Sequence, residues 1–201
     1  MKENKKHMIR WRSFTVFSCT IGLLVGIFSV ISDNLPYFGE KITMIEFVVS
    51  YLAVMINSLP VWFSLAMVAG FLFARELKGS VIVGVIYTLA AITFYFVISN
   101  IYGSNTVTSS FVERVLRYLL WYIVSAVGGL LGGSAGFLLK KNHYTILILT
   151  IGLMVQIIIN GGSSWNNMVG IAQNTTYCLM LVSTIIYLII QGKRHSLYMQ
   201  S

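Results

Sequence analysis

Charged side chains are scarce in this chain, at 10% of its 201 residues, and six of those residues are acidic. Soluble domains carry about 25% charged residues. The scarcity comes with 57% hydrophobic residues and a mean hydropathy of +0.81. These values exclude a soluble globular domain and a disordered chain. The length suits one membrane-embedded, all-α domain over residues 1–201, with little left for a soluble domain.

Groups that commonly carry catalysis or bind metals are also rare. Cys19 and Cys178 lie inside apolar runs, so neither predicts an external disulfide or a metal pair. Residues 132–136 match the G-x-S-x-G pattern, but that motif needs a strand-to-helix turn and a histidine base. The three histidines lie in flanks of apolar runs, at His7, His143 and His195. We therefore expect no enzyme, no metal and no cofactor.

No Asp, Glu, Lys, Arg or His lies near the middle of any apolar run. Ionisable groups within the membrane usually mark proton relays and routes for charged substrates. Their absence argues against a proton-coupled transporter. It favours a protein that binds a neutral or weakly polar molecule, or one that acts through partners.

The positive charge is gathered in short segments between or outside the apolar runs. This distribution is typical of the positive-inside rule and of contact with anionic headgroups, and it argues against nucleic acid as a partner. The apolar run after the basic segment 1–12 is about twenty residues long and lacks an A-x-A site, which predicts an uncleaved anchor. Eleven of the 14 Lys and Arg form four clusters: Lys2/Lys5/Lys6/Arg10/Arg12, Arg75/Lys78, Lys140/Lys141 and Lys193/Arg194.

The apolar runs predict six transmembrane helices with both termini in the cytoplasm. With this topology eleven Lys and Arg are cytoplasmic and three are external. We therefore predict a multi-pass protein of the plasma membrane, with the bilayer as its main partner. The predicted spans cover about 13–31, 44–74, 80–101, 113–141, 144–159 and 175–190, with outer loops at 33–41, 102–110 and 160–174.

The second span is predicted to be kinked or broken. The run 44–74 is too long for one upright span and too short for two. Pro60 cannot donate a hydrogen bond to the Ile56 carbonyl, so the helix is expected to bend there. One long kinked helix and a re-entrant half-helix followed by a span both fit this pattern.

Small residues at four-residue spacing predict close contacts between helices. The glycine-rich fourth span carries two adjacent rows and is expected to be the packing axis of the bundle. The rows are Gly128, Gly132 and Gly136, and Ser125, Gly129 and Gly133; shorter rows are Ser18, Gly22 and Gly26 in the first span, and Ser80, Gly84 and Thr88 in the third.

Asn57, Ser58 and Trp62 form the strongest local candidate for a binding site. A broken membrane helix exposes backbone groups that must face protein, water or a ligand. Asn57 is able to orient a polar group of a ligand, and Trp62 to stack on it. The alternative is an ordinary proline kink in which Asn57 bonds to a neighbouring helix.

Two further candidates lie on the outer side. Arg114 and Arg117 are able to clamp an anionic group, or Arg117 pairs with Glu113 on the surface while Arg114 reaches a headgroup. Trp165 belongs either to a lid over the site or to an interfacial anchor.

The order of these features resembles an uncharacterised bacterial family of six-span membrane proteins, a domain of unknown function. The resemblance covers about 44–140, roughly half the chain. It rests on Asn57-Ser58…Trp62, the segment TFYFVISNIYG and the span from Trp121 to Gly136. It implies a bacterial origin and brings no established activity.

The chain is also similar to the substrate-binding membrane subunits of energy-coupling-factor vitamin transporters, which have six spans and both termini inside. In those subunits faces of small residues dock a partner subunit. The resemblance implies this role for the row Ser18, Gly22 and Gly26.

Two functions follow as hypotheses. The first is a solute-binding or transport-related subunit for a neutral or weakly polar molecule, with its site between residues 57–62 and the glycine-rich helix. The second is a non-catalytic accessory protein, such as an immunity, regulatory or assembly factor, acting through contacts with a partner subunit or another copy of itself. A central polar cavity favours the first, and a solid interior with an exposed stripe of small residues favours the second.

Overall fold

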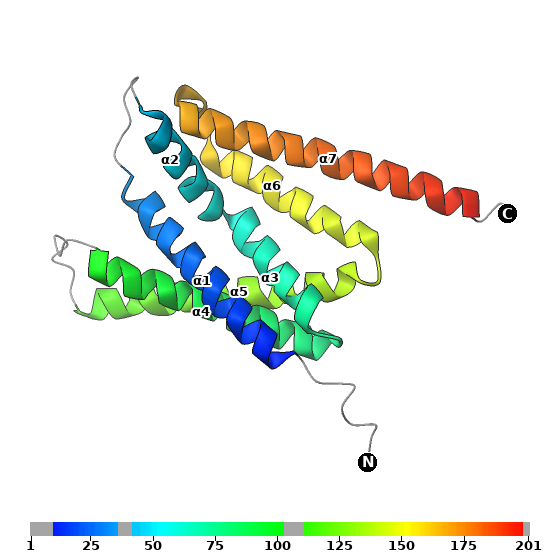
Figure 1. Cartoon of the computed structure of the whole chain (residues 1–201), viewed down its shortest axis with the longest axis horizontal. Coiled ribbons are helices and arrows are strands. Elements are labelled where there is room, and N and C mark those ends of the chain that lie inside the picture. The colour runs from blue at the N-terminus through cyan, green and yellow to red at the C-terminus, as the bar shows by residue number, and fades with distance from the viewer. Residues whose placement is uncertain (1–9, 36–41, 103–110, 199–201) are drawn as a thin grey trace, which may run out of the picture.

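The computed structural model describes residues 10–35, 42–102 and 111–198, with side chains described as far as Gly192. These residues fold as helices joined by short connections (Figure 1). The elements are α1 (Trp11–Asp33), α2 (Met44–Ile56), α3 (Leu59–Phe73), α4 (Leu77–Tyr102), α5 (Phe111–Leu139), the 3-10 helix η2 (His143–Ile146), α6 (Leu147–Asn160), the 3-10 helix η3 (Gly162–Asn166) and α7 (Met168–Tyr198).

Within the described residues, five helical segments are long and apolar enough to cross a membrane: α1, α4, α5, η2 with α6, and α7. The pair α2 and α3 passes the same test together and makes a sixth, with a bend of 61° between its two halves. The prediction of an all-α membrane bundle whose second span is broken near Pro60 is therefore confirmed.

The break lies at Asn57 and Ser58, three and two residues before Pro60. Asn57 ends α2, and the backbone of Ser58 is extended, with φ −91° and ψ 148°. Pro60 lies in the first turn of α3. Backbone N–H groups in a first turn have no partner within the helix, so a proline there costs no helical hydrogen bond. The local sequence therefore ends one helix and begins another.

Glycine lets α5 approach its neighbours more closely than any side chain would allow. A Cβ on Gly84 would collide with the Gly129 carbonyl oxygen, and one on Gly133 with the Ser80 carbonyl oxygen. A Cβ on Gly136 would collide with the carbonyl oxygen of Met67 in α3. These contacts place α5 directly against α3 and α4.

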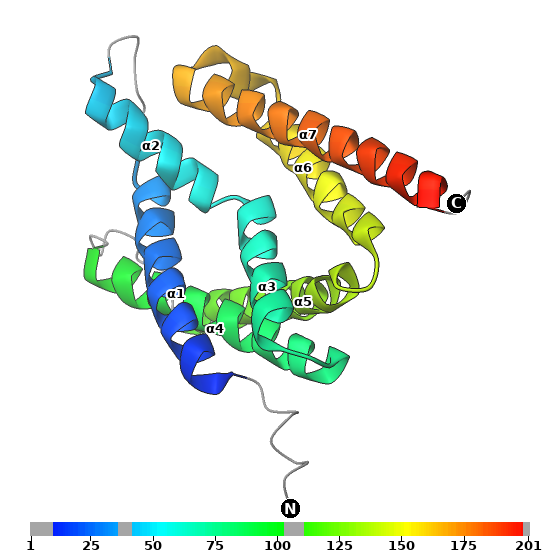
Figure 2. The ribbon, with the colours of Figure 1, turned by 45° about the vertical axis from the view of Figure 1, so that its right-hand side comes forward.

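The helices form two groups with a gap between them. α4 packs along α1 and α5, and α3 packs along α4 and α5. On the other side α7 lies along α2 and α6, and α6 touches α3 (Figures 1 and 2). The gap between α3, α5 and α6 holds the cavity described below.

Basic segments from distant parts of the sequence meet at one end of the molecule. The ring of Phe14 in α1 lies 5.7 Å from that of Phe73 at the end of α3. The Lys140 ammonium donates a hydrogen bond to the Ala74 carbonyl, and burial, followed by the charge of Arg75, lowers the pKa of Lys140.

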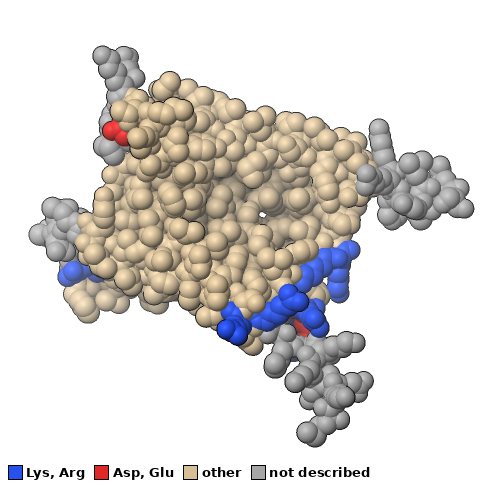
Figure 3. Space-filling model, viewed as in Figure 1, with Lys and Arg blue, Asp and Glu red and all other residues tan. Residues whose placement is uncertain are grey.

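The start of η2 and the far part of α7 lie together at this end, since Tyr144 approaches Gly192. Figure 3 shows the Lys and Arg side chains gathered there, with a smaller group at the opposite end. Segments near both ends of the chain thus lie at the same end of the molecule, as an even number of membrane crossings requires. That this end is cytoplasmic stays a prediction.

One predicted loop is wrong in its extent. Residues 160–174 were expected to form an outer loop, but η3 covers Gly162–Asn166 and α7 begins at Met168. The Asn167 side chain accepts a hydrogen bond from the Gly170 N–H, at 2.7 Å, which caps the start of α7. Most of the predicted loops 33–41 and 102–110, and most of the basic segment 1–12, lie outside the described residues.

Candidate functional site

A cavity of ≈ 690 Å³ lies between the helix break, the glycine-rich helix α5 and α6. Its volume falls in the range of small-molecule sites, about 300–1,000 Å³. Figure 3 shows the surface hollowed on this face of the molecule. Its lining is mostly apolar, with hydroxyl, amide and carboxylate groups contributed by Asp33, Asn57, Thr88, Tyr95, Ser125 and Gln156.

Asp33, the last residue of α1, supplies a carboxylate to one end of the cavity. Its Oδ1 accepts a hydrogen bond from the Asn57 amide, at 3.1 Å, and its Oδ2 accepts one from the Tyr95 hydroxyl, at 2.6 Å. From the sequence, Asp33 was predicted to lie in the outer loop 33–41. Asn57 lies at the break in the second span, directly after the thirteen residues of α2. Its hydrogen bond to Asp33 therefore places the end of α1 beside this break.

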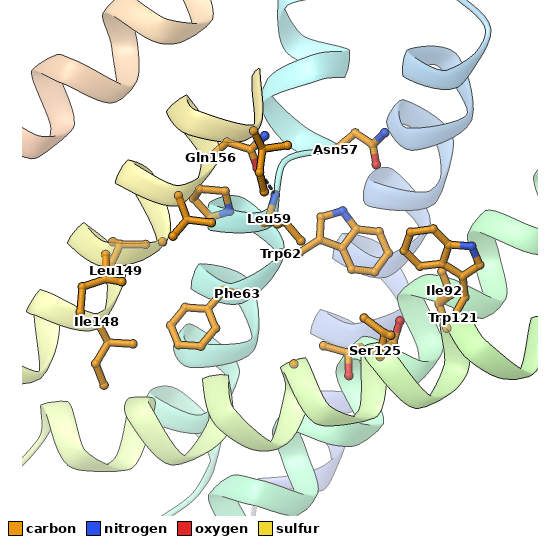
Figure 4. Close-up of a pocket in the computed structure, with 18 of the residues that line it drawn as sticks. Asn57, Leu59, Trp62, Phe63, Ile92, Trp121, Ser125, Ile148, Leu149 and Gln156 are labelled. Carbon is orange, nitrogen blue, oxygen red and sulfur yellow. Dashed lines mark hydrogen bonds between the residues drawn. The ribbon is translucent and has the colours of Figure 1, made fainter. Parts of the chain in front are cut away.

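Aromatic rings and aliphatic side chains form the remainder of the lining. Figure 4 shows Trp62 and Trp121 toward the Asn57 end, Phe63 in the middle, and Ile148 and Leu149 at the α6 side. A ligand in this cavity would contact polar groups at one end and hydrocarbon along its body.

Gln156 connects α6 to the helix break. Its Oε1 accepts a hydrogen bond from the Leu59 N–H, at 3.1 Å, across 97 positions of sequence. Leu59 is the first residue of α3, so this N–H has no carbonyl of its own helix to bond. An amide from α6 therefore satisfies a backbone group that the break leaves open.

The hydrogen bonds continue from Gln156 toward α7. The amide of Gln156 donates to Asn160, at 2.8 Å, and the amide of Asn160 donates to Asn174, also at 2.8 Å. Gln173 donates to the Val54 carbonyl of α2, at 3.0 Å. The network thus joins both sides of the break to α6 and α7.

Asp33, Tyr95 and Gln156 line the cavity but were not predicted as site residues. For Gln156 a signal existed, because it is a lone amide inside the apolar run 144–159. Asp33 and Tyr95 carried no such signal, since Asp33 lies at the start of a predicted loop and Tyr95 is one of several tyrosines inside apolar runs. Their meeting depends on how α1 and α4 pack.

Of the predicted ligand-binding residues, the structure places Asn57 and Trp62 in the cavity lining. Ser58 is buried and donates to the Met55 carbonyl, at 2.6 Å. Arg114 and Arg117 are exposed on the first turns of α5, and Trp165 is 45% exposed on η3. None of these four is among the residues that line this cavity.

Gly128 differs from the other glycines of α5. A Cβ there would meet nothing within 4 Å, and the residue lines the cavity. Gly132 instead contacts α3, since a Cβ there would lie 2.7 Å from the Ala66 Cβ. Gly22 and Gly26 of α1 face Phe94 of α4.

The formal G-x-S-x-G serine lies inside a helix. Ser134 belongs to α5, and its hydroxyl donates to the Leu130 carbonyl, at 2.7 Å. Across residues 10–35, 42–102 and 111–192, no three His, Cys, Asp or Glu side chains gather as metal ligands would. The side chains of the cavity are suited to binding an amphiphilic molecule by contact and hydrogen bonding.

The fold and the span lengths define a polytopic helical membrane protein with a cavity beside a broken helix. No family model, curated protein or solved structure matches the chain.

Proposed function

We propose that this protein is a solute-binding or transport-related membrane subunit for a small molecule with a largely apolar body. The observation that carries the proposal is the ≈ 690 Å³ cavity between the break and α5. Interiors of folded proteins contain few voids larger than a water molecule, so a cavity of this size beside the helix break suggests a place for a ligand.

The lining supports a ligand with few polar groups. Hydroxyl and amide groups from Thr88, Ser125 and Gln156 are spread among aliphatic and aromatic side chains. The hydrogen bond between Gln156 and the Leu59 N–H supports the broken helix and joins two residues of the cavity lining. Asp33 is a charged exception at one end of the cavity.

The accessory role would need a face of small residues open to a partner. The row Ser18, Gly22 and Gly26, to which the transporter-subunit resemblance assigns docking, is covered by α4. This geometry favours the solute-binding role over docking through that row.

Filling the cavity tests the proposal. Gly128→Leu places a side chain into the cavity from a position where a Cβ meets nothing, and Gly162→Leu on η3 is a matched control outside the cavity lining. We expect wild type and Gly162→Leu to gain thermal stability from the same members of a library of small metabolites, and Gly128→Leu to lose that gain. Native mass spectrometry of the purified proteins gives an independent readout of a retained molecule.

An absence of both stabilisation and retained molecules in wild type would favour the accessory role. Equal responses from Gly128→Leu and wild type would show that the cavity is not the binding site.

A further inference from the structure

The carboxylate of Asp33 is the charged group among the described residues that line the cavity. Its two hydrogen-bond partners within the described part of the chain, Asn57 and Tyr95, are neutral donors. They fix both oxygens of the carboxylate, and neither of them carries a positive charge that would balance it. Asp33 is exposed, so its carboxylate lies at an accessible edge of the apolar cavity, where it attracts a positively charged group.

The position of Asp33 on its helix adds a second electrostatic effect. Asp33 is the C-terminal residue of α1, where the helix dipole carries partial negative charge. An anion there is unfavourable, whereas a cation nearby is favoured by both the dipole and the carboxylate. The site therefore prefers a positive ligand on two electrostatic grounds.

Aromatic side chains line the same end of the cavity. The indole rings of Trp62 and Trp121 belong to the lining, and Figure 4 shows both toward the side of Asn57, which holds Asp33. Indole faces attract ammonium groups through the ring quadrupole, most strongly where water is excluded. Trp121 is 50% exposed, so the aromatic end remains accessible.

We propose that this end of the cavity binds the ammonium head of an amphiphilic organic cation, with Asp33 as its counter-ion and Trp62 and Trp121 as its aromatic walls. The inference rests on the proposed function and names the ligand class for the same cavity. The apolar body of the cation extends past Phe63 toward the aliphatic side chains of α6. It replaces the expectation of a neutral ligand, which depended on an absence of charge in the spans.

The test compares a cation with its uncharged counterpart on the purified full chain in dodecyl maltoside micelles. The probes are phenethyltrimethylammonium and the isostere in which a tert-butyl group replaces trimethylammonium. Binding is measured by tryptophan fluorescence and by thermal shift. We expect wild type to bind the cation about tenfold or more tightly than the isostere.

Two variants locate the effect. Asp33→Asn keeps the size and a hydrogen-bond acceptor and should lose the preference for the cation while binding the isostere as before. Glu46→Gln is the matched control, because Glu46 caps α2 by accepting from the Thr43 N–H, at 2.8 Å, and glutamine preserves such a cap. It should keep the full preference.

The outcomes separate the two proposals. Equal affinity of wild type for both probes, or an unchanged preference in Asp33→Asn, would overturn the cation site while leaving the solute-binding function intact. Binding of neither probe to wild type would count against both. If Asp33→Asn does not fold, the comparison of the two probes on wild type still decides the matter.

A free amine and the headgroup of an amine-bearing lipid share this chemistry. Titration of phosphatidylethanolamine into the same micelles distinguishes them. Displacement of the cationic probe identifies a lipid headgroup, and undiminished binding identifies a free solute; either result supports the cation site.

Discussion

Two buried tyrosines illustrate how differently one side chain is accommodated in this bundle. Tyr87 and Tyr177 are both fully buried. The hydroxyl of Tyr177 accepts a hydrogen bond from the Gln173 amide, at 3.0 Å. Among the described residues the hydroxyl of Tyr87 has no partner, and its ring packs against Phe17 at 5.6 Å.

This difference predicts opposite effects of the same substitution. Tyr87→Phe removes an unsatisfied hydroxyl and should leave stability unchanged or raise it by about 1 kcal/mol. Tyr177→Phe removes a bonded hydroxyl and should lower stability by about 1 kcal/mol. Thermal unfolding of both variants in the same detergent measures the difference. A loss for Tyr87→Phe as large as that for Tyr177→Phe would show that Tyr87 has an unseen hydrogen-bond partner.

At the scale of single elements, the break between α2 and α3 depends on more than Pro60. Ser58 donates to the Met55 carbonyl, and Gln156 accepts from the Leu59 N–H, so two side chains replace the helical bonds that the bend removes. In hydrocarbon such groups must be satisfied by protein. The bend of 61° is therefore stabilised by a side chain of α6 as well as by the local sequence.

Helix α5 offers a matched pair of glycines that face different surroundings. Gly136→Ala should destabilise the protein by about 1–3 kcal/mol, because its Cβ would collide with the backbone of α3 at Met67. Gly128→Ala should be neutral or stabilising by up to about 1 kcal/mol, since its Cβ meets nothing and alanine favours the helix. Thermal unfolding in detergent compares them. The same loss in both variants would mean that Gly128 also packs against a neighbour.

At the scale of the whole molecule, charge and crossing number agree with each other. The start of the first span and the ends of the second, fourth and sixth spans lie at one end of the molecule, as six crossings require. The residues that mark this end are Phe14, Ala74, Lys140 and Gly192. The acidic Asp33 lies away from this end, at the far terminus of α1.

Labelling from outside the cell tests the orientation. In a chain whose Cys19 and Cys178 are replaced by serine, Trp165→Cys should react with a membrane-impermeant maleimide in intact cells. Leu77→Cys and Asn142→Cys should react only after permeabilisation, because the positive-inside rule places their basic neighbours in the cytoplasm. Reaction of Leu77→Cys in intact cells would contradict the predicted orientation.

The amino-acid sequence by itself determined the class of protein, the approximate positions of most spans and the broken second helix. Each of these depends on local properties: runs of apolar residues long enough for a bilayer, and a proline that cannot continue a helical ladder. Asn57 and Trp62 were also visible, because polar and aromatic residues next to a break are unusual in hydrocarbon.

Tertiary structure alone decided which groups meet at the cavity. Asp33, Tyr95 and Gln156 come from three helices and are separated by up to 123 positions, so no local pattern connects them. The same holds for Gly128, which shares its spacing with Gly132 and Gly136 but faces the cavity. Four-residue spacing places side chains on one face of a helix, whereas the neighbour opposite each position is set by how the helices tilt and cross.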